Sequence, residues 1–515
     1  MSKLQYRPEL DGIRAISILL VLLFHIDKNF IPGGFIGVDI FFVLSGFLIS
    51  KIIIIGIQNH TFSYNDFYKR RIKRILPPFY FMVLLTVISS FFIFLPSDIN
   101  QLIKSAISTL IFSSNYFFSG GLDYFSSNAD EQPLLHTWSL AVEEQFYFLF
   151  PILIYFLIRI KNRNKLYLLL LCIFSFLIAE ILSNIDATKS FSYFSLPTRM
   201  GELLIGTLCA LTTIKLKHTL FQYIGLGLII FSSFFIDEKT AFPGIFAFIP
   251  CLGAGLLILS ENKDTTLFKI LSNSIVTYIG KLSFSLYLFH WPILAFSRYI
   301  TGEYSLIQNN SIYIIILIII FISIFSYEFV ENKVRYSKLN FKKSFIYIYL
   351  IPSLLIILLT FFYWTGKLQF NEYSKDITSY DNNLNICHNK FLNNCYLGNG
   401  SIKVALFGDS HAAQISYFLL HKESDYSFYL NSASSCPIFD NIDLSHITSN
   451  SIYNRCIDLR NNIKEEINKF DIIFVSQKWD QYLLDKDNIK KIEQWLAKYK
   501  DKKNYFFYYN HQSIN

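Results

Sequence analysis

The sequence predicts a polytopic α-helical membrane domain followed by a water-soluble domain. Of its 515 residues, 52% are hydrophobic and only 16% are charged, whereas a soluble globular chain carries about 25% charged residues. The charges are also unevenly distributed. Residues 1–366 hold 29 Lys and Arg against 21 Asp and Glu, while residues 367–515 hold 17 of each. This composition excludes a simple soluble enzyme and a disordered protein.

The apolar part contains eleven candidate membrane-spanning helices. A helix needs about 20 predominantly apolar residues to cross a bilayer. The short apolar segment 103–118 has polar flanks, so we expect it to be re-entrant or interfacial. The predicted spans are 12–28, 36–56, 77–96, 139–158, 166–184, 198–214, 219–236, 243–260, 282–298, 311–330 and 344–365.

The basic residues between these spans indicate the orientation of the chain. With a cytoplasmic N-terminus, alternating spans place 21 Lys and Arg on the inner side and 5 on the outer side. The outer five are Lys28, Lys104, Lys189, Lys239 and Arg298, and the inner set includes Arg7, Lys51, Arg71, Arg74, Lys215 and Arg335. Basic residues concentrate in cytoplasmic loops, so we interpret the positive charge as a topology signal and expect no nucleic-acid partner. An odd number of spans then places residues 367–515 outside the cytoplasm.

Cysteine usage agrees with an exported C-terminal domain. That domain contains an even number of cysteines, Cys387, Cys395, Cys436 and Cys456, and even numbers in exported domains favour disulfides. Pairing of sequence neighbours, 387 with 395 and 436 with 456, is the most economical of three connectivities. The alternative is four free thiols.

Charged residues within a span are costly and therefore candidates for function. Arg14 and His25 both lie in the first predicted span. Eleven residues at 3.6 per turn place them on one face, about 16 Å apart along the axis. A permanent cation and a titratable base in this arrangement suit an anionic donor that enters from the cytoplasm. The alternatives are an interfacial arginine and a structural histidine.

The second span and the segment before the third span add two further polar groups. Asp39 and Ser45 interrupt an apolar run, and the following Gly46 would permit close approach of another helix. Helix packing alone would also explain this group. Arg71 and Arg74 share a helix face, although they also fit the positive-inside signal, and the Pro-Pro pair after them is expected to begin the next span.

The fourth span begins with an unusual polar sequence. His136, Ser139 and Glu143 follow a three-four spacing and would share a face. Glu143 and Glu144 could balance Arg14 or Arg199, or could transfer protons. Favourable interaction with the helix dipole is the alternative explanation.

Two later spans contain further polar pairs. Arg199 and Glu202 are three residues apart, and Tyr287 and His290 lie on one face of another span. Either pair could be structural. Six polar groups in one bundle nevertheless indicate a lined cavity rather than lipid-facing helices.

These polar groups, together with four sequence segments, resemble the acyltransferase family 3 membrane domain, over about residues 5–340. Members of that family move acyl groups, commonly acetyl, from cytoplasmic acyl-CoA to extracytoplasmic sugars. The resemblance implies that His25, Arg14, Arg71 and Arg74 are the residues on which activity depends. It is carried by these four residues and by the segments FFVLSGFL (41–48), WSLAVEEQF (138–146), SLYLFHWP (285–292) and YEFVE (327–331).

The C-terminal domain resembles a second family. The segment VALFGDSHA (404–412) predicts a strand, a tight turn and a helix that would present Ser410 as a nucleophile. Its Gly-Asp-Ser-His sequence is similar to the first conserved block of the SGNH hydrolases, which implies an α/β, flavodoxin-like domain. We expect a membrane domain at 1–343, an additional transmembrane helix at 344–366, a linker at 367–402 and the SGNH-like domain at 403–515.

The SGNH-like domain departs from its family. The Asp-x-x-His that activates the serine in that family is not found after Ser410, and His511 is four residues from a terminus that looks cut short. The domain is therefore expected to be incomplete, and Ser410 is either a working nucleophile or a remnant. The expected elements are strands 403–408, 471–477 and 504–510 and helices 411–421, 457–469 and 487–499.

Together these features predict a membrane O-acyltransferase, specifically an O-acetyltransferase, in a bacterial inner membrane. Arg14, Arg71 and Arg74 would bind the phosphates of acetyl-CoA, and His25 would act as general base or transient acyl acceptor, with Glu143 as a further catalytic candidate. The expected acceptor is a cell-surface glycan, with lipopolysaccharide O-antigen first and peptidoglycan second. A non-catalytic transporter or sensor is the alternative. No bound cofactor or metal is expected.

Overall fold

The computed structural model divides into two compact units, Met1–Asn371 and Glu372–Asn515. In the first unit the structure describes residues 6–120, 124, 127–159, 164–301 and 311–365. In the second it describes 395–397, 400–409, 412–413, 425–433, 436–442, 444, 450–470, 472–477, 486–499 and 504–508.

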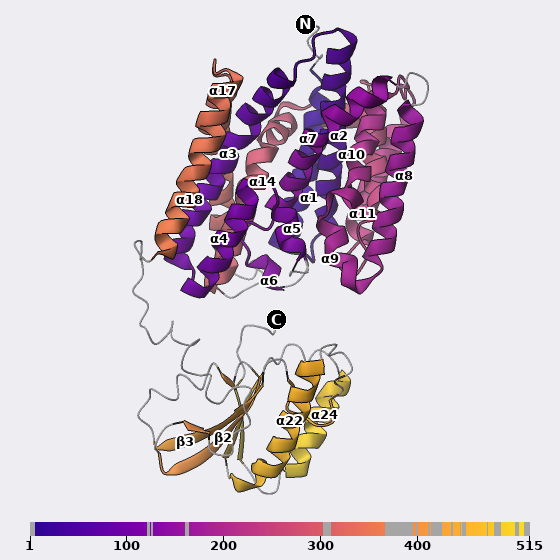
Figure 1. Cartoon of the computed structure of the whole chain (residues 1–515). Helices are drawn as coiled ribbons and strands as arrows, with labels where there is room; N and C mark the ends of the chain where they lie inside the picture. Colours follow the sequence, from indigo (N-terminus) through magenta and orange to yellow (C-terminus); the bar gives the residue numbers. More distant parts are fainter. Residues whose placement is uncertain are drawn as a thin grey trace. The chain divides into compact units, whose positions relative to one another are not determined.

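The first unit is built from helices (Figure 1). Its closest helix pairs are α2 with α10, α1 with α14, and α11 with α12. The elements are α1 (Pro8–Ile26), η1 (Gly34–Ile36), α2 (Gly37–Gln58), α3 (Tyr64–Ile93), α4 (Pro96–Leu110), α5 (Ser114–Ser119), α6 (Ser127–Asp130), α7 (Thr137–Arg159), α8 (Asn164–Ser183), α9 (Asp186–Phe194), α10 (Leu196–Leu211), α11 (Leu220–Phe235), α12 (Ile245–Leu259), α13 (Thr266–Leu271), α14 (Ser274–Thr301), α15 (Ser311–Phe325), η3 (Ser326–Glu331), α16 (Asn332–Arg335), α17 (Phe341–Ser344), η4 (Phe345–Leu350) and α18 (Ile351–Trp364).

Each of the eleven predicted spans falls on helical structure. Within the described residues, five helical segments are long and apolar enough to cross a membrane by length and composition. The full count of eleven stays a prediction. The five segments are Gly34–Gln58, Tyr64–Ile93, Lys165–Ser183, Ser311–Arg335 and Phe341–Trp364.

The helix that contains the third predicted span does not begin at its proline pair, and the expectation of a helix start there was wrong. Helix α3 starts at Tyr64, where the side chain of Ser63 accepts a hydrogen bond from the Asp66 amide. Pro77 and Pro78 therefore lie inside a continuous helix. The two prolines have no amide hydrogen to donate to the preceding turn, but an N-terminal cap and the buried face of α3 keep the helix continuous. As a result, Arg71 and Arg74 lie on the same helix as the apolar span.

Two glycines allow α2 and α10 to pack closely, as predicted for Gly46. A Cβ atom at Gly46 would overlap the carbonyl oxygen of Leu203 on α10. Reciprocally, a Cβ atom at Gly206 would overlap the carbonyl oxygen of Val43 on α2. Small residues permit such contacts between helices in membranes. The interface thereby fixes the position of Ser45 relative to α10.

We expect Gly46→Val to destabilise the helical unit, because the added side chain must separate two backbones that are in contact. Overpacking of this kind costs about 1–3 kcal/mol. The matched control is Gly227→Ala on α11, where an added Cβ meets nothing within 4 Å. Thermal unfolding in detergent should show a lower transition only for Gly46→Val. Equal transitions for this variant and the wild type would contradict the close contact.

The second unit contains a five-stranded sheet in the order β1-β3-β2-β4-β5. The strands β2 to β5 run parallel, and β1 pairs antiparallel with β3. The parallel order places β2 beside both β3 and β4, as in a flavodoxin-like sheet. The strands are β1 (Tyr396–Leu397), β2 (Ile402–Gly408), β3 (Tyr426–Ser432), β4 (Ile472–Ser476) and β5 (Asn504–Tyr508).

Alternating residues of β2 face two separate cores. Ala405 and Phe407 pack with residues of α22 (Asn450–Glu466) and α24 (Lys486–Tyr499), and both helices lie beside the sheet in Figure 1. Val404 and Leu406 belong to a second cluster with Ala412. The central strand is therefore buried on both faces, as expected for a parallel sheet.

The sequence placed β2, β4, β5 and α24 within two residues of their observed ends, but it missed β3. No strand or helix was expected over residues 426–432, although in the structure this strand is almost entirely buried. Helix α22 begins at Asn450, seven residues before the expected 457. Most of the predicted helix 411–421 lies outside the described residues.

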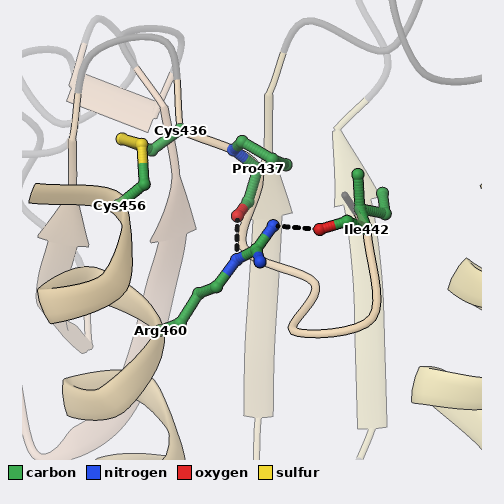
Figure 2. The surroundings of a disulfide bond; sticks show 5 residues. All are labelled: Cys436, Pro437, Ile442, Cys456 and Arg460. Carbon is green, nitrogen blue, oxygen red and sulfur yellow. Dashed lines mark hydrogen bonds between the residues drawn. A yellow bond between two sulfur atoms is a disulfide. The ribbon is translucent and has the colours of Figure 1, made fainter. Parts of the chain in front are cut away.

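A disulfide attaches the segment after β3 to α22. Cys436 and Cys456 are bonded, with Cα atoms 5.1 Å apart. One turn further along α22, Arg460 donates hydrogen bonds to the carbonyl oxygens of Pro437 (3.1 Å) and Ile442 (2.9 Å), as Figure 2 shows. Cys395 is also disulfide-bonded, whereas Cys387, its predicted partner, lies outside the described residues.

Candidate active site

The helical unit contains a cavity of about 890 Å³ whose charged lining residues are mostly basic. Eight basic and four acidic side chains contribute to its wall. Several predicted site residues, from α1, α2, α3, α7 and α14, meet there: Arg14, Ser45, Arg71, Arg74, Glu143 and Tyr287. The basic residues are Arg7, Arg14, Lys51, Arg71, Arg74, Lys215, Lys281 and Arg335, and the acidic residues are Asp11, Glu143, Glu261 and Glu331.

Arg71 and Arg74 face this cavity without a carboxylate partner. Among the described residues, neither guanidinium group lies within salt-bridge distance of an acid. The guanidinium of Arg71 lies 5.8 Å from the ring centre of Phe67 and 5.5 Å from that of Tyr147. Its Nε atom is buried without a hydrogen-bond partner in the described part of the chain. Two permanent cations that lack a carboxylate partner are able to bind an anion.

Arg14 and Glu143 line the same cavity but have protein partners. Arg14 forms a 3.1 Å salt bridge with Asp11, one turn earlier on α1. The carboxylate of Glu143 accepts hydrogen bonds from Ser45 (2.7 Å) and Tyr147 (3.2 Å). Glu143 is therefore oriented by two hydroxyl groups rather than by an arginine.

His25 lies at the opposite end of α1 and is not part of the cavity lining described above. Its Nδ1 atom is 2.9 Å from Nε2 of His290, and its Nε2 atom is 3.0 Å from the hydroxyl of Tyr124. Arg298 donates a hydrogen bond to the carbonyl oxygen of His25. Arg14 and His25, which were predicted on one face of the helix, therefore do not both line this cavity.

Tyr287 connects the two regions. It lines the cavity, and its ring centre is 5.5 Å from that of His290. Its hydroxyl lies 2.6 Å from the hydroxyl of Ser139 and donates a hydrogen bond to the carbonyl oxygen of His136. The ring of His136 is 6.0 Å from His290. Ser139, Tyr287 and His136 thus connect the cationic cavity to the pair formed by His25 and His290.

Arg199, Asp39 and Glu202 form a separate, fully buried ion cluster. Arg199 lies 2.8 Å from Asp39 and 3.0 Å from Glu202, and its Nε donates to the carbonyl oxygen of Tyr193. Three aromatic rings, of Trp138, Tyr193 and Phe242, surround its guanidinium at 4.6–5.2 Å. The suggestion that Glu143 or Glu144 balances Arg199 was wrong, because Asp39 and Glu202 occupy that position.

Sequence reasoning missed three residues of these two regions. Arg298 was counted with the outer loops, although an arginine at the end of an apolar helix is itself a signal; it is 3% exposed. Arg335 of the cavity was counted as part of the inner positive charge. Tyr124 lies in a polar stretch and gives no signal in the sequence.

Two predicted residues of the second unit, Ser410 and His511, lie outside the described residues. The neighbouring Asp409 is described: its amide donates a 3.3 Å hydrogen bond to the carbonyl oxygen of Ser476. Gly408 permits this approach, because a Cβ atom there would overlap the same oxygen. The turn after β2 is thus closed against the end of β4. Within the described residues, no group of three His, Cys, Asp or Glu side chains could hold a metal ion.

We expect Arg199→Met to destabilise the helical unit strongly, because it leaves Asp39 and Glu202 buried without their cation. Breaking a buried ion pair from one side costs about 3–5 kcal/mol. Arg335→Met is the control: its side chain is 40% exposed and lies 3.8 Å from Glu331, and such a pair contributes about 0–1 kcal/mol. Thermal unfolding should separate the two variants. A wild-type transition for Arg199→Met would exclude a structural role for the cluster.

Comparisons with known proteins agree with this arrangement. Residues 7–328 match an acyltransferase domain, and residues 380–510 match the SGNH domain that is fused to such domains. The chain is 33% identical to the O-acetyltransferase OatA of Staphylococcus aureus (strain MRSA252), over 68% of this chain and 63% of the relative. It is also 33% identical to a putative O-acetyltransferase of S. aureus (strain MSSA476), over 73% and 65%.

The chain thus spans less than two thirds of the length of these relatives. No solved structure gives a significant match. The apolar helices and the matched domain indicate a multi-pass membrane protein. The chain belongs to the acyltransferase family whose membrane domain is fused to an SGNH domain.

Proposed function

We propose that this protein is a membrane O-acetyltransferase that transfers an acetyl group from cytoplasmic acetyl-CoA to a glycan at the cell surface. The family match and the names of the relatives support acyl transfer to an oxygen atom. Lipopolysaccharide O-antigen and peptidoglycan are the two acceptors to test, by mass spectrometry of each glycan with and without the protein.

The observation that carries this proposal is the pair of unpaired arginines in the cationic cavity. Coenzyme A carries a diphosphate and a 3′-phosphate, whereas the acetyl thioester at its other end is neutral. A guanidinium group binds phosphate through two parallel hydrogen bonds. Arg71 and Arg74 would hold the phosphates, and the excess of basic residues around them would attract the polyanion.

The charge distribution supports entry of the donor from the cytoplasm. Six of the cavity's basic residues belong to the set assigned to the inner side by the positive-inside rule. None of the five basic residues assigned to the outer side lines the cavity. The six are Arg7, Lys51, Arg71, Arg74, Lys215 and Arg335. In this orientation His25 lies towards the outer side, and the SGNH domain faces the acceptor.

His25 supplies the base for the transfer in this proposal. The attacking hydroxyl loses its proton to the imidazole as its oxygen bonds to the acetyl carbon. The carbon–sulfur bond then breaks, and the proton passes to the departing thiolate of coenzyme A. Transient acylation of the imidazole is the alternative course, and an acyl-imidazole trapped by acid quenching would distinguish it. Glu143 is the further proton-transferring candidate at the cavity.

Replacing the two arginines should affect binding of the donor's phosphates and not the transfer step. We expect Arg71→Ala and Arg74→Ala each to raise KM for acetyl-CoA by about 10- to 100-fold, the cost of a lost charged hydrogen bond. Turnover with acetyl-pantetheine, which lacks the nucleotide, should stay near the wild-type value. The measurement is thiol release by purified protein.

The control for this experiment is Arg70→Ala, which removes an exposed arginine next to Arg71 that does not line the cavity. It should leave KM for acetyl-CoA unchanged. Equal effects of all three substitutions, or equal losses with both donors, would refute the assigned phosphate site. Absence of thiol release from the wild-type protein with any acyl-CoA would favour a transporter or sensor.

A further inference from the structure

The two buried histidines form an ordered chain that ends on a backbone carbonyl. Nδ1 of His290 lies 3.1 Å from the carbonyl oxygen of Leu286, one turn earlier on α14. Nε2 of His290 lies 2.9 Å from Nδ1 of His25, and Nε2 of His25 lies 3.0 Å from the hydroxyl of Tyr124. His25 is 4% exposed and His290 is fully buried.

The carbonyl oxygen determines the direction of every hydrogen bond in this chain. A carbonyl only accepts, so Nδ1 of His290 must carry its proton. In a neutral imidazole the other nitrogen is then an acceptor, and Nδ1 of His25 must donate to it. His25 consequently keeps its lone pair on Nε2. In the opposite tautomer of His25, two lone pairs would face each other across 2.9 Å.

Both rings are held in this arrangement by their surroundings. The two rings are nearly parallel, with centres 5.1 Å apart and an interplanar angle of 16°, and Trp291 packs edge-on against His25 at 4.5 Å. The helices that carry them approach closely, because a Cβ atom at Gly280 of α14 would overlap the carbonyl oxygen of Asp11 on α1. Arg298 fixes the last turn of α1 through the carbonyl oxygen of His25.

The charges around the two rings favour neutral imidazoles, since a buried imidazolium needs an anionic partner. Among the described residues, neither imidazole is paired with a carboxylate. Asp130, the acid in this region, contacts Lys28 at 3.2 Å and Arg298 at 3.9 Å instead. The neutral pair is therefore the form that this environment stabilises.

We propose that His290 is a positioning residue that fixes His25 in the tautomer with a free lone pair on Nε2. This inference rests on the proposed function in taking His25 as the base. The hydroxyl of Tyr124 donates to that lone pair, and it marks the place that an acceptor hydroxyl takes when His25 removes its proton. His290 acts through His25 and does not itself touch the reacting atoms.

The tautomer can be measured without any activity assay. Solid-state NMR of the full-length protein in lipid bilayers, with ¹⁵N-labelled histidine, distinguishes protonated from unprotonated ring nitrogens. The His25 signals are identified by their loss in His25→Gln. We expect Nδ1 of His25 to be protonated and Nε2 to be unprotonated in the wild type. A protonated Nε2 with an unprotonated Nδ1 would overturn the proposal.

Kinetics supply the second test. His290→Leu removes the acceptor for His25 Nδ1, so the productive tautomer should become scarce and kcat should fall by about 10- to 100-fold. The KM for acetyl-CoA should not change, because the phosphate site is untouched. His290→Gln offers an amide oxygen near the position of Nε2 and should restore kcat to within about 5-fold of the wild type. Tyr124→Phe should leave the His25 tautomer unchanged.

The outcomes separate this inference from the proposed function. Full kcat in His290→Leu, or equal losses in the leucine and glutamine variants with intact folding, would contradict a positioning role. If His290→Leu does not yield folded protein, the wild-type spectrum still decides the tautomer. A wild-type protein that shows the expected tautomer but transfers no acyl group would refute the proposed function and leave the hydrogen-bond chain in place.

Discussion

Charge inside an apolar helical bundle must be neutralised by a partner or exposed to a cavity, and the helical unit is organised by this constraint. The charge of Arg199 is neutralised by partners: two carboxylates, a backbone carbonyl and three aromatic rings surround its guanidinium. The charges of Arg71 and Arg74 are exposed to a cavity instead, and no acid lies within salt-bridge distance of them in the described part of the chain. The first arrangement stabilises the bundle, and the second leaves charge available for a ligand.

Helix α1 relates the two ends of the proposed reaction path. Arg14 near its start lines the cationic cavity, and His25 near its end contacts His290 and Tyr124. Eleven residues of helix separate them by about 16 Å, which is close to half the thickness of a hydrocarbon core of about 30 Å. The extended pantetheine arm of the donor could cover such a distance. Tyr287, between the cavity and His290, lies where this path would pass.

Candidate site residues could be predicted from the sequence where a charged residue interrupts an apolar segment. Arg14, His25, Asp39 and Glu143 were identified because each is expensive in an apolar helix. Arg71 was identified by its spacing from Arg74 and by the resemblance to the acyltransferase family. The pairing of these residues could not be obtained in the same way, since it depends on which helices are neighbours. His25 and His290 are 265 positions apart, and only the packing of α1 against α14 brings them together. Asp39 was grouped with Ser45 by sequence, yet its charge partner is on α10.

Prediction of helices and strands from the local sequence pattern also failed where tertiary packing determines the structure. The prolines of α3 suggested a helix start, although Ser63 caps the helix well before them. Strand β3 was missed because it carries polar residues, but it is covered on both sides within the sheet of the second unit. Tyr124 is polar in a polar stretch, so only its 3.0 Å contact with His25 distinguishes it.

The central claim is that an acetyl group enters at the arginine cavity on one side of the membrane and leaves at His25 towards the other. The most direct measurement uses proteoliposomes that enclose a glycan acceptor, with labelled acetyl-CoA added outside and the protein inserted with its cytoplasmic face outwards. The account predicts that labelled acetyl ester appears on the enclosed glycan with the wild-type protein and not with His25→Ala. Transfer at the wild-type rate by His25→Ala, or acetylation only of glycan added outside, would contradict it.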